Sequence, residues 1–451
     1  MDKQRLSFYF GRFGQYVPLL TALVFIGIAA VHESNVDGYS LAFFAAILVG
    51  CLLAKDRNAY GDAAVSGLAR PMFGTVAVAI LFAAIAGKLI SGSGLINTLA
   101  GLLIAARLPG GAFCALTFLI CCLLSLSTGT SVGTYVITTP ILFPVGVLLG
   151  VDPAFLIGAI VSGGLFGDNL APISDTTIAS AGTQGARMGD VVRSRCWYSL
   201  PVACVCFLLY LVLGGGSTAQ APDSVPAVEP RSLLMLVIPA VVIFLCLRGT
   251  HLLAALSLGI LSGTLLALAA GIYTFSDLFS YPGGFSVGGV YIEAILGTAS
   301  TLFMLIGAFL FLGVIERTGI IELAADRISR LSRGRKSAEA SILLSVGLLG
   351  AVTGVCTVSM VALGDVVAQI GAAFGIDKCR RANLMDCGGL ALTALAPWTV
   401  HAVYPATLAA LACPELLLSP LQVVAHNFYA QLMLLLMCVA ILTGYHRTKS
   451  R

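Results

Sequence analysis

Two aspartates, Asp168 and Asp175, stand in the segment GGLFGDNLAPISDTTIASAGT at 163–183. Between residues 108 and 186 the only other charged residue is Asp152. A carboxylate near the centre of a bilayer costs roughly 2.5 to 3.5 kcal/mol on insertion scales, so aspartates in a membrane-length apolar segment need compensation. Either a proton or a bound cation can neutralise such a group. A site that accepts one or the other, but not both together, can exchange protons for cations.

The residues around the two carboxylates carry the oxygen atoms that hard cations prefer. We expect Asp175, just beyond Pro172, to bind a sodium ion directly, and Asp168 to act as a second metal ligand or as a proton carrier. For Ser174 or Asp175 the alternative role is that of a helix N-cap. The other candidate ion-binding residues are Asn169, Ser174, Thr176, Thr177, Thr128, Thr130, Ser131, Thr353, Thr357 and Thr393.

The composition indicates a polytopic membrane protein. Of the 451 residues, 58% are hydrophobic and only 10% are charged, whereas soluble domains carry about 25% charged residues. Apolar runs approach or exceed the roughly 20 residues that cross a bilayer. The net charge of +4 arises from basic residues in short loops, so no nucleic-acid partner is expected. The 13 cysteines form no CxxC pair and are typical of small buried apolar residues.

The apolar runs predict an all-α protein with about 12 to 14 membrane segments. The first run resembles a signal peptide, but we interpret it as an uncleaved helix because many spans follow. With a cytoplasmic N-terminus, all but three of the 25 basic residues fall on the cytoplasmic side, Arg195 in a loop among them. The exceptions are Lys88, Arg107 and Arg231. This distribution satisfies the positive-inside rule and predicts that both termini are cytoplasmic.

The chain contains an internal repeat. Shifting the sequence by 225 residues places STGTSVGT (127–134) on VTGVCTVS (352–359), and GGLFGDNLAP (163–172) on GGLALTALAP (388–397). The loop at 92–111 holds one basic residue, whereas its counterpart at 316–337 holds six, which indicates opposite orientation. Inverted repeats with interrupted helices are typical of secondary transporters, whose cargo binds where the broken helices meet.

Breaks in the apolar segments support this interpretation. Ser, Thr and Gly residues near 127–131 and 353–354 fall in the middle of paired apolar segments, as the tips of re-entrant hairpins would. Pro172 and Pro397 interrupt the segment that follows each pair. Close helix packing is the alternative role of these small residues. The expected organisation is N-terminal membrane helices at 1–70, repeat 1 at 71–213, an external linker at 214–231, connecting membrane helices at 232–289, repeat 2 at 290–444 and a cytoplasmic tail at 445–451.

The second repeat differs from the first in its polar residues. In the 225-residue register Thr393 corresponds to Asp168 and His401 to Thr176. Trp398 and Tyr404 are candidates to line a pocket for an organic cargo. The proton-carrier candidates are Asp168, Asp175, Asp365 and His401, although a buried histidine is more often structural. Asp386 is expected simply to pair with Arg381, five residues away, near the membrane interface.

Two motifs carry a resemblance to a known family. The segment GDNLAPISDTT, with GTSVGT upstream and TQG and DVVRSR downstream, resembles the signature of the NhaC-type sodium/proton antiporter family, part of a superfamily of inverted repeats with re-entrant hairpins. One departure is Ala171, where the family commonly has serine. The residues that match are Gly129, Thr130, Ser131, Gly133, Thr134, Gly167, Asp168, Pro172, Ser174, Asp175, Thr176 and Thr177. The family also includes exchangers of organic acids and amino acids.

The resemblance implies a secondary transporter of the bacterial inner membrane that exchanges cytoplasmic Na⁺ for external H⁺. The alternative is a Na⁺- or H⁺-coupled exchanger of amino acids or carboxylates on the same fold; the apparent lack of a basic residue inside the repeat cores favours inorganic cations. A membrane-embedded hydrolase and a channel are weaker alternatives. No enzyme motif is present, and no cofactor is expected beyond the transported ions. The expected partners are membrane lipid, Na⁺ and H⁺, with a homodimer as a candidate assembly.

Overall fold

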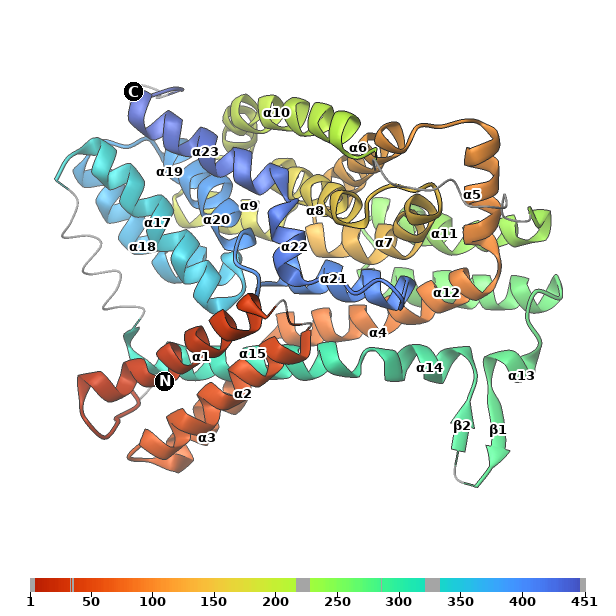
Figure 1. The fold of residues 1–451 in the computed structure, drawn as a ribbon. Helices are drawn as coiled ribbons and strands as arrows, with labels where there is room; N and C mark the ends of the chain where they lie inside the picture. Colours follow the sequence, from red (N-terminus) through yellow and green to blue (C-terminus); the bar gives the residue numbers. More distant parts are fainter. Residues whose placement is uncertain are drawn as a thin grey trace.

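The computed structural model describes residues 5–32, 34, 36–215, 228–284, 286–320 and 333–446. Helices dominate it (Figure 1), and most run along the same long direction of the molecule. The N-terminal helices are α1 (Arg12–Val31), α2 (Val36–Leu53) and α3 (Arg57–Leu68). In the segment predicted as repeat 1 the helices are α4 (Pro71–Gly92), α5 (Leu95–Ala105), α6 (Gly110–Thr128), α7 (Ser131–Leu148), α8 (Pro153–Leu170), α9 (Asp175–Thr183) and α10 (Met188–Leu213).

The second half of the chain continues with connecting elements and the second set of helices. The connecting elements are the 3₁₀-helix η1 (Pro230–Leu236), α11 (Val237–Leu247), α12 (Leu252–Ala269), α13 (Phe275–Leu278), β1 (Ser280–Gly283) and β2 (Ser286–Gly288). The remaining helices are α14 (Val290–Gly297), α15 (Ala299–Thr318), α17 (Arg335–Thr353), α18 (Cys356–Ala373), α19 (Lys378–Asn383), the π-helix η2 (Leu384–Gly388), α20 (Gly389–Ala394), α21 (Val400–Ala412), α22 (Pro420–Ala425) and α23 (Phe428–Thr443).

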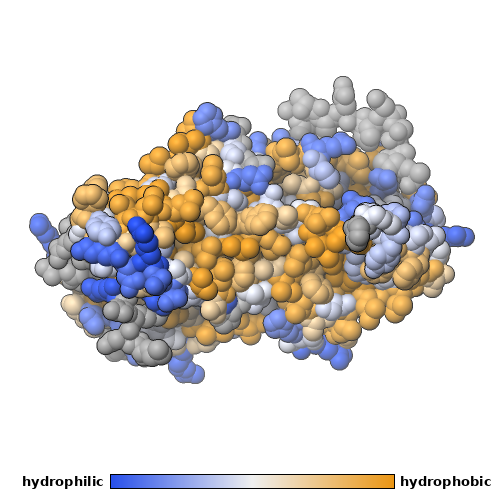
Figure 2. Space-filling view, turned by 90° about the horizontal axis from the view of Figure 1, so that it is seen from below, coloured by the Kyte–Doolittle hydropathy of each residue, from blue (hydrophilic) through white to orange (hydrophobic). Residues whose placement is uncertain are grey.

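The surface and the helix lengths are those of a membrane protein. Within the described part of the chain, 10 helices are long and apolar enough to cross a bilayer, and several shorter apolar helices accompany them. Leucines such as Leu48, Leu123 and Leu208 are exposed on the outer helices. Figure 2 shows a broad hydrophobic surface across the middle of the molecule, with many hydrophilic residues toward its two ends. In water such a surface would promote association, whereas in lipid it needs no cover.

The 225-residue repeat is visible in the helix boundaries. The hairpin α6–α7 occupies 110–128 and 131–148, and the hairpin α17–α18 occupies 335–353 and 356–373. Each boundary is therefore displaced by the same 225 residues. The first helix of each hairpin ends at a glycine in the left-handed region, Gly129 with φ of 71° and Gly354 with φ of 75°. Glycine adopts this conformation without a steric cost, so both hairpins turn sharply at equivalent positions.

The helix that follows each hairpin is interrupted, as the prolines predicted. Helix α8 ends at Leu170 and α9 begins at Asp175, with Pro172 in the gap. In the second half α20 ends at Ala394 and α21 begins at Val400, with Pro397 in the gap. Proline lacks the N–H that a continuous helix needs, and it disfavours helical geometry in the residue before it. The second copy also contains the π-helix η2, which has no equivalent in α8.

Each hairpin packs against the interrupted helix of the other repeat. Helix α7 lies against α21, and α18 lies against α9. At the second contact Gln184, just after α9, donates a hydrogen bond of 3.0 Å to the carbonyl of Gly364 in α18. The exchange is reciprocal, as a pseudo-two-fold relation between inverted repeats requires. It brings both hairpin tips to the breaks in the helices.

The structure departs from the sequence expectations in three places. The strands β1 and β2 form an antiparallel hairpin that projects from the helices (Figure 1), so the region predicted as connecting membrane helices is not all helical. Helix α5 lies in the segment 92–111, which was predicted to be a loop. Helix α10 begins at Met188, so Arg195 lies inside a helix and not in the predicted loop. Of the predicted linker and C-terminal tail, 216–227 and 447–451 lie outside the described residues, as do 321–332 of the basic loop.

Candidate ion-binding site

Asp168 joins the tip of the first hairpin to the break in the interrupted helix. It lies near the C-terminal end of α8, and its side chain is buried. Ser131, the first residue of α7, donates a hydrogen bond of 2.7 Å to Oδ2. Ser174, in the break, donates one of 2.5 Å to Oδ1. Both carboxylate oxygens are thus held by hydroxyl groups, and a second hydroxyl, Thr176 Oγ1, lies 2.9 Å from Ser174 Oγ.

Asp175 makes the matching link to the second hairpin. It is the first residue of α9 and is exposed. Its Oδ2 accepts a hydrogen bond of 2.9 Å from Thr357 Oγ1, in the first turn of α18. Its Oδ1 accepts one of 3.0 Å from the backbone N–H of Thr176. Ser174 occupies the N-cap position of α9, but its side chain makes no capping hydrogen bond and is committed to Asp168, so the capping alternative for Ser174 is wrong.

A cavity of about 980 Å³ gives both carboxylates access to solvent. The residues of the predicted site that line it come from both hairpins and from α8 and α9: Thr128, Thr130, Ser131, Asp168, Asp175, Thr176 and Thr357. The buried hydroxyl of Thr128 has no hydrogen-bond partner among the described residues. The same cavity is lined by His251 and by Arg70 and Glu316, which form an ion pair. Most of the remaining wall is apolar.

Five of the predicted ion-binding residues do not line this cavity, among them Ser174, whose hydroxyl donates to Asp168. Asn169 and Thr177 face the opposite side of the break, toward Asp386. Thr353 donates to the carbonyl of Val355 at 3.0 Å, within its own hairpin tip. Thr393 is fully buried in α20 and donates to the carbonyl of Gly389 at 2.9 Å. The structure therefore gathers the residues of the first hairpin and of α9 at the cavity, but only Thr357 from the second repeat.

The expected pairing of Asp386 with Arg381 is wrong. Asp386 is fully buried in η2, and its carboxylate lies 2.7 Å from NH1 of Arg195, which is also fully buried. Arg381 instead donates to the carbonyl of Ala368 at 2.8 Å. Residues five apart on a helix point about 140° away from each other, so the local pair was geometrically disfavoured. Arg195 also corrects the expectation that the repeat cores contain no basic residue.

The other proton-carrier candidates lie at different depths. His401, in α21, is buried at the cavity wall, and its Nδ1 lies 3.3 Å from the hydroxyl of Tyr135 in α7. This contact crosses from one repeat to the other and matches the structural alternative for a buried histidine. Asp365 is exposed on α18 and does not line the cavity. The structure thus separates Asp365 from the two carboxylates of the predicted site.

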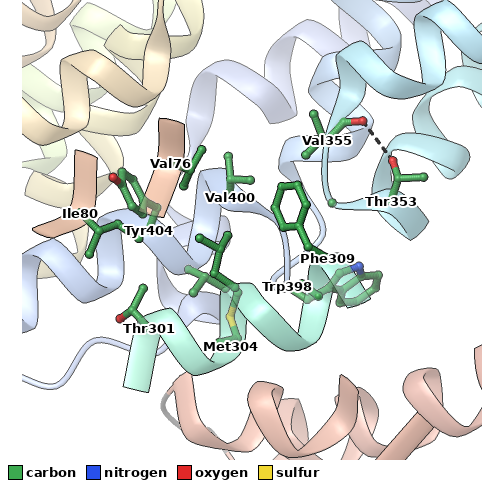
Figure 3. A pocket seen from close by; sticks show the side chains of 14 residues that line it. Val76, Ile80, Thr301, Met304, Phe309, Thr353, Val355, Trp398, Val400 and Tyr404 are labelled. Atoms are coloured by element: carbon green, nitrogen blue, oxygen red, sulfur yellow. Dashed lines mark hydrogen bonds between the residues drawn. The ribbon is translucent and has the colours of Figure 1, made fainter. Parts of the chain in front are cut away.

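Trp398 and Tyr404 line a second, much smaller pocket (Figure 3). It measures about 30 Å³, room for about two water molecules and not for an organic cargo. Trp398 Nε1 donates to the carbonyl of Ala351 at 2.6 Å, whereas the buried Tyr404 hydroxyl has no partner among the described residues. Val76, Val355 and Val400 line both this pocket and the large cavity. These three side chains separate the two spaces, and we call them the valine layer.

Paired hairpins, interrupted helices that meet at their tips, and carboxylates at the breaks define an integral membrane secondary transporter. The sequence profile of the Na⁺/H⁺ antiporter family matches residues 10–215 and 228–443. The chain belongs to this family, and the resemblance to NhaC-type antiporters is confirmed.

Three curated relatives show the breadth of the family. The Na⁺/H⁺ antiporter NhaC of Alkalihalophilus pseudofirmus is 28% identical over 65% of this chain and 67% of its own. The malate-2H⁺/Na⁺-lactate antiporter of Bacillus subtilis is 24% identical over 81% of each chain. The arginine/ornithine antiporter ArcD of Halobacterium salinarum is 25% identical over 63% of this chain and 64% of its own. All three are antiporters, so antiport is common to the relatives while the cargo varies.

Proposed function

We propose that the protein exchanges cytoplasmic Na⁺ for external H⁺ by competition at Asp168 and Asp175. The observation that carries the proposal is the linkage of each carboxylate to a different hairpin: Asp168 to Ser131 and Asp175 to Thr357. A group that binds at these carboxylates therefore contacts both repeats at once. Such contact lets the occupancy of the site bias the position of one repeat against the other, which a coupled exchanger requires.

The donor set suits a small hard cation. The hydroxyls of Ser131, Ser174 and Thr357 donate to carboxylate oxygens. A sodium ion between the carboxylates would be bound by those carboxylate oxygens and by the lone pairs of hydroxyls that rotate their protons away. A proton on a carboxylate removes the negative charge that holds the ion. The proton and the sodium ion therefore compete for the same carboxylates.

Access to the site favours the cytoplasmic side. The cavity wall includes Arg70 and the segment Gly249–His251, which follows Arg248 in a loop that the charge distribution places in the cytoplasm. The valine layer closes the opposite direction, toward the small pocket. We infer an inward-open conformation in the bacterial inner membrane with both termini cytoplasmic. Protons would reach the carboxylates from outside after the valine layer opens and the cytoplasmic entrance closes.

A second candidate function is exchange of carboxylates or amino acids. The size of the cavity, about 980 Å³, exceeds the needs of a sodium ion. Arg70 at its wall supplies a cation that a carboxylate cargo would approach, although it is paired with Glu316. The names of the malate/lactate and arginine/ornithine relatives favour keeping this alternative. In that case Asp168 and Asp175 would bind the coupling ion rather than the cargo.

The test is cation-driven proton movement in proteoliposomes that contain the purified protein and a pH dye. Wild type, Asp175→Asn and Asp168→Asn are compared on addition of Na⁺, Li⁺ or K⁺, with Asp190→Asn as a matched control because Asp190 is a surface residue outside the cavity. We expect Na⁺-driven proton release in wild type and in the control, and its loss in both site variants. A folded wild type that gives no cation-driven signal refutes sodium/proton exchange. Malate, lactate and arginine are then the cargoes to test.

A further inference from the structure

A second buried carboxylate lies on the other side of the break from the cavity. Asp386 and Arg195 are both fully buried, and their closest atoms are 2.7 Å apart. They come from η2 and α10, so the pair joins the two repeats. Asp168 and Asn169 are consecutive, and consecutive helical residues point about 100° apart. Asp168 thus faces the cavity while Asn169 faces Asp386.

Asp386, like Asp168, is surrounded by polar side chains that donate to its carboxylate oxygens. Asn169 Nδ2 donates to Oδ1 at 3.0 Å, and Ser180 Oγ lies 3.3 Å from Oδ2. Thr177 Oγ1 lies 3.5 Å from the same oxygen. The backbone carbonyl of Asn169 points to the same place. A carboxylate, two hydroxyls and a freed carbonyl form a set of oxygen ligands suited to a cation.

The guanidinium of Arg195 fills this set of oxygens. Its NH1 lies 2.5 Å from the carbonyl of Asn169 and 2.8 Å from Thr177 Oγ1, besides Asp386. Its NH2 lies 3.3 Å from Ser180 Oγ, and its Nε donates to Asn383 Oδ1 at 3.2 Å. The carbonyl of Asn169 is among the last of α8, where a helix has no partners of its own. Arg195 satisfies it and so fixes the geometry of the break.

We infer that Asp386, Asn169, Thr177 and Ser180 form a second cation site, and that the Arg195 guanidinium is its tethered, permanent occupant. The inference rests on the proposed exchange at Asp168 and Asp175 and deepens it. Because a covalently attached cation cannot leave, the charge of Asp386 is constant throughout the cycle. Only Asp168 and Asp175 then exchange a bound proton for a bound cation during the cycle. Arg195 is accordingly a positioning residue, which acts on the exchange site through the break that it holds.

This role differs measurably from that of a structural salt bridge. A structural pair needs the shape and length of arginine, whereas a cation site needs a positive charge in the space that the guanidinium leaves. Removing one partner of a buried pair strands the other charge, while removing both relieves the imbalance. Arg195→Ala therefore creates an empty cation site, and Arg195→Ala with Asp386→Asn creates a cavity without charge. The double variant is the matched control for the single one.

The experiment measures the melting temperature of the purified full-length protein in detergent. Wild type, Arg195→Ala and the double variant are titrated with guanidinium, Na⁺ or Li⁺ chloride at low concentration, with choline chloride at equal ionic strength as the reference. We expect Arg195→Ala to melt below the double variant and to regain stability in a concentration-dependent manner with guanidinium or a small alkali cation. Wild type and the double variant should show no such rise.

Two results would overturn the inference. The first is equal melting of the single and double variants, and the second is a destabilised single variant that responds to none of the cations. If Arg195→Ala cannot be purified, the purification is repeated with guanidinium present throughout. Recovery only under that condition supports the site, and failure refutes it. The measurement needs no transport, so a wild type without Na⁺-driven proton release would refute the proposed function while leaving this result readable.

Discussion

Thr357 donates a hydrogen bond of 2.9 Å to Asp175 across 182 residues of sequence, and so ties the tip of the second hairpin to the interrupted helix of the first repeat. We predict that Thr357→Ala weakens sodium binding, because the site loses a hydroxyl ligand and a link between the repeats. A lost ion–oxygen contact of about 1.4 kcal/mol corresponds to a tenfold change in affinity, so the sodium concentration for half-maximal exchange should rise roughly tenfold. Titration of proton release with Na⁺ measures this shift.

Thr357→Ser is the control for that variant, since it keeps the hydroxyl and removes only a methyl group. It should exchange with nearly wild-type sodium dependence. An alanine variant with unchanged sodium dependence would show that Thr357 does not contribute to the ion site.

The valine layer predicts that a smaller side chain at one of its positions lets protons leak through the protein. Val400, with Val76 and Val355, separates the large cavity from the small pocket. We expect Val400→Ala to let water through a barrier that is one side chain thick, and to raise passive proton flux in proteoliposomes without sodium. The comparison is Val205→Ala, which removes the same atoms from an exposed position on α10. Equal passive flux in the two variants would place the barrier elsewhere.

Asp365 provides a test of how well the cavity defines the site. It was a proton-carrier candidate by its place in an apolar segment, but it is exposed and lies outside the cavity wall. We predict that Asp365→Asn keeps sodium-driven proton release within about twofold of wild type, as surface substitutions usually change little. The initial rate of proton release checks this. Loss of exchange, with the protein still folded, would restore Asp365 to the proton path.

Arg70 separates the two candidate functions. It lies at the cavity wall in an ion pair with Glu316. If the cargo is a carboxylate, Arg70→Gln should abolish uptake of labelled malate or lactate, because no other arginine or lysine in the described residues lines the cavity. If the cargo is sodium, proton release should persist in this variant. The double variant Arg70→Gln with Glu316→Gln controls for the charge left on Glu316.

Much of the architecture could be predicted because it depends on local sequence. Left-handed turns need glycine and helix breaks favour proline, so Gly129, Gly354, Pro172 and Pro397 located the hairpin tips and the interruptions. The 225-residue register of the sequence repeat equals the displacement between the boundaries of the two hairpins in the structure. Asp168 and Asp175 were identified as neighbours for the same reason, since their separation is set within one interrupted helix.

Pairings between distant elements could not be predicted in this way. Asn169 follows Asp168 directly, yet one helical step of about 100° turns it to a different neighbour. Asp386 found its partner in α10, far away in the sequence. A signal for Arg195 did exist: Val191, Arg195, Tyr198 and Val202 recur at helical spacing, and all four are buried. An arginine on an otherwise apolar stripe indicates a buried partner. The stripe was not recognised because Arg195 was predicted to lie in a loop.

The two hairpins have equivalent helix boundaries, which bears on the relative energies of the inward-open conformation and its outward-open counterpart. Geometric symmetry lets the repeats trade conformations, so that the second hairpin would adopt the arrangement of the first. The side chains do not follow that symmetry: the position equivalent to Asp175 is Val400, and the one equivalent to Thr357 is Val132. The exchanged arrangement would set two valines against each other where a carboxylate and a hydroxyl now meet. The inward-open and outward-open conformations would therefore differ in energy, and in the proposed exchange the ion or proton bound at the carboxylates would decide how far that difference is offset.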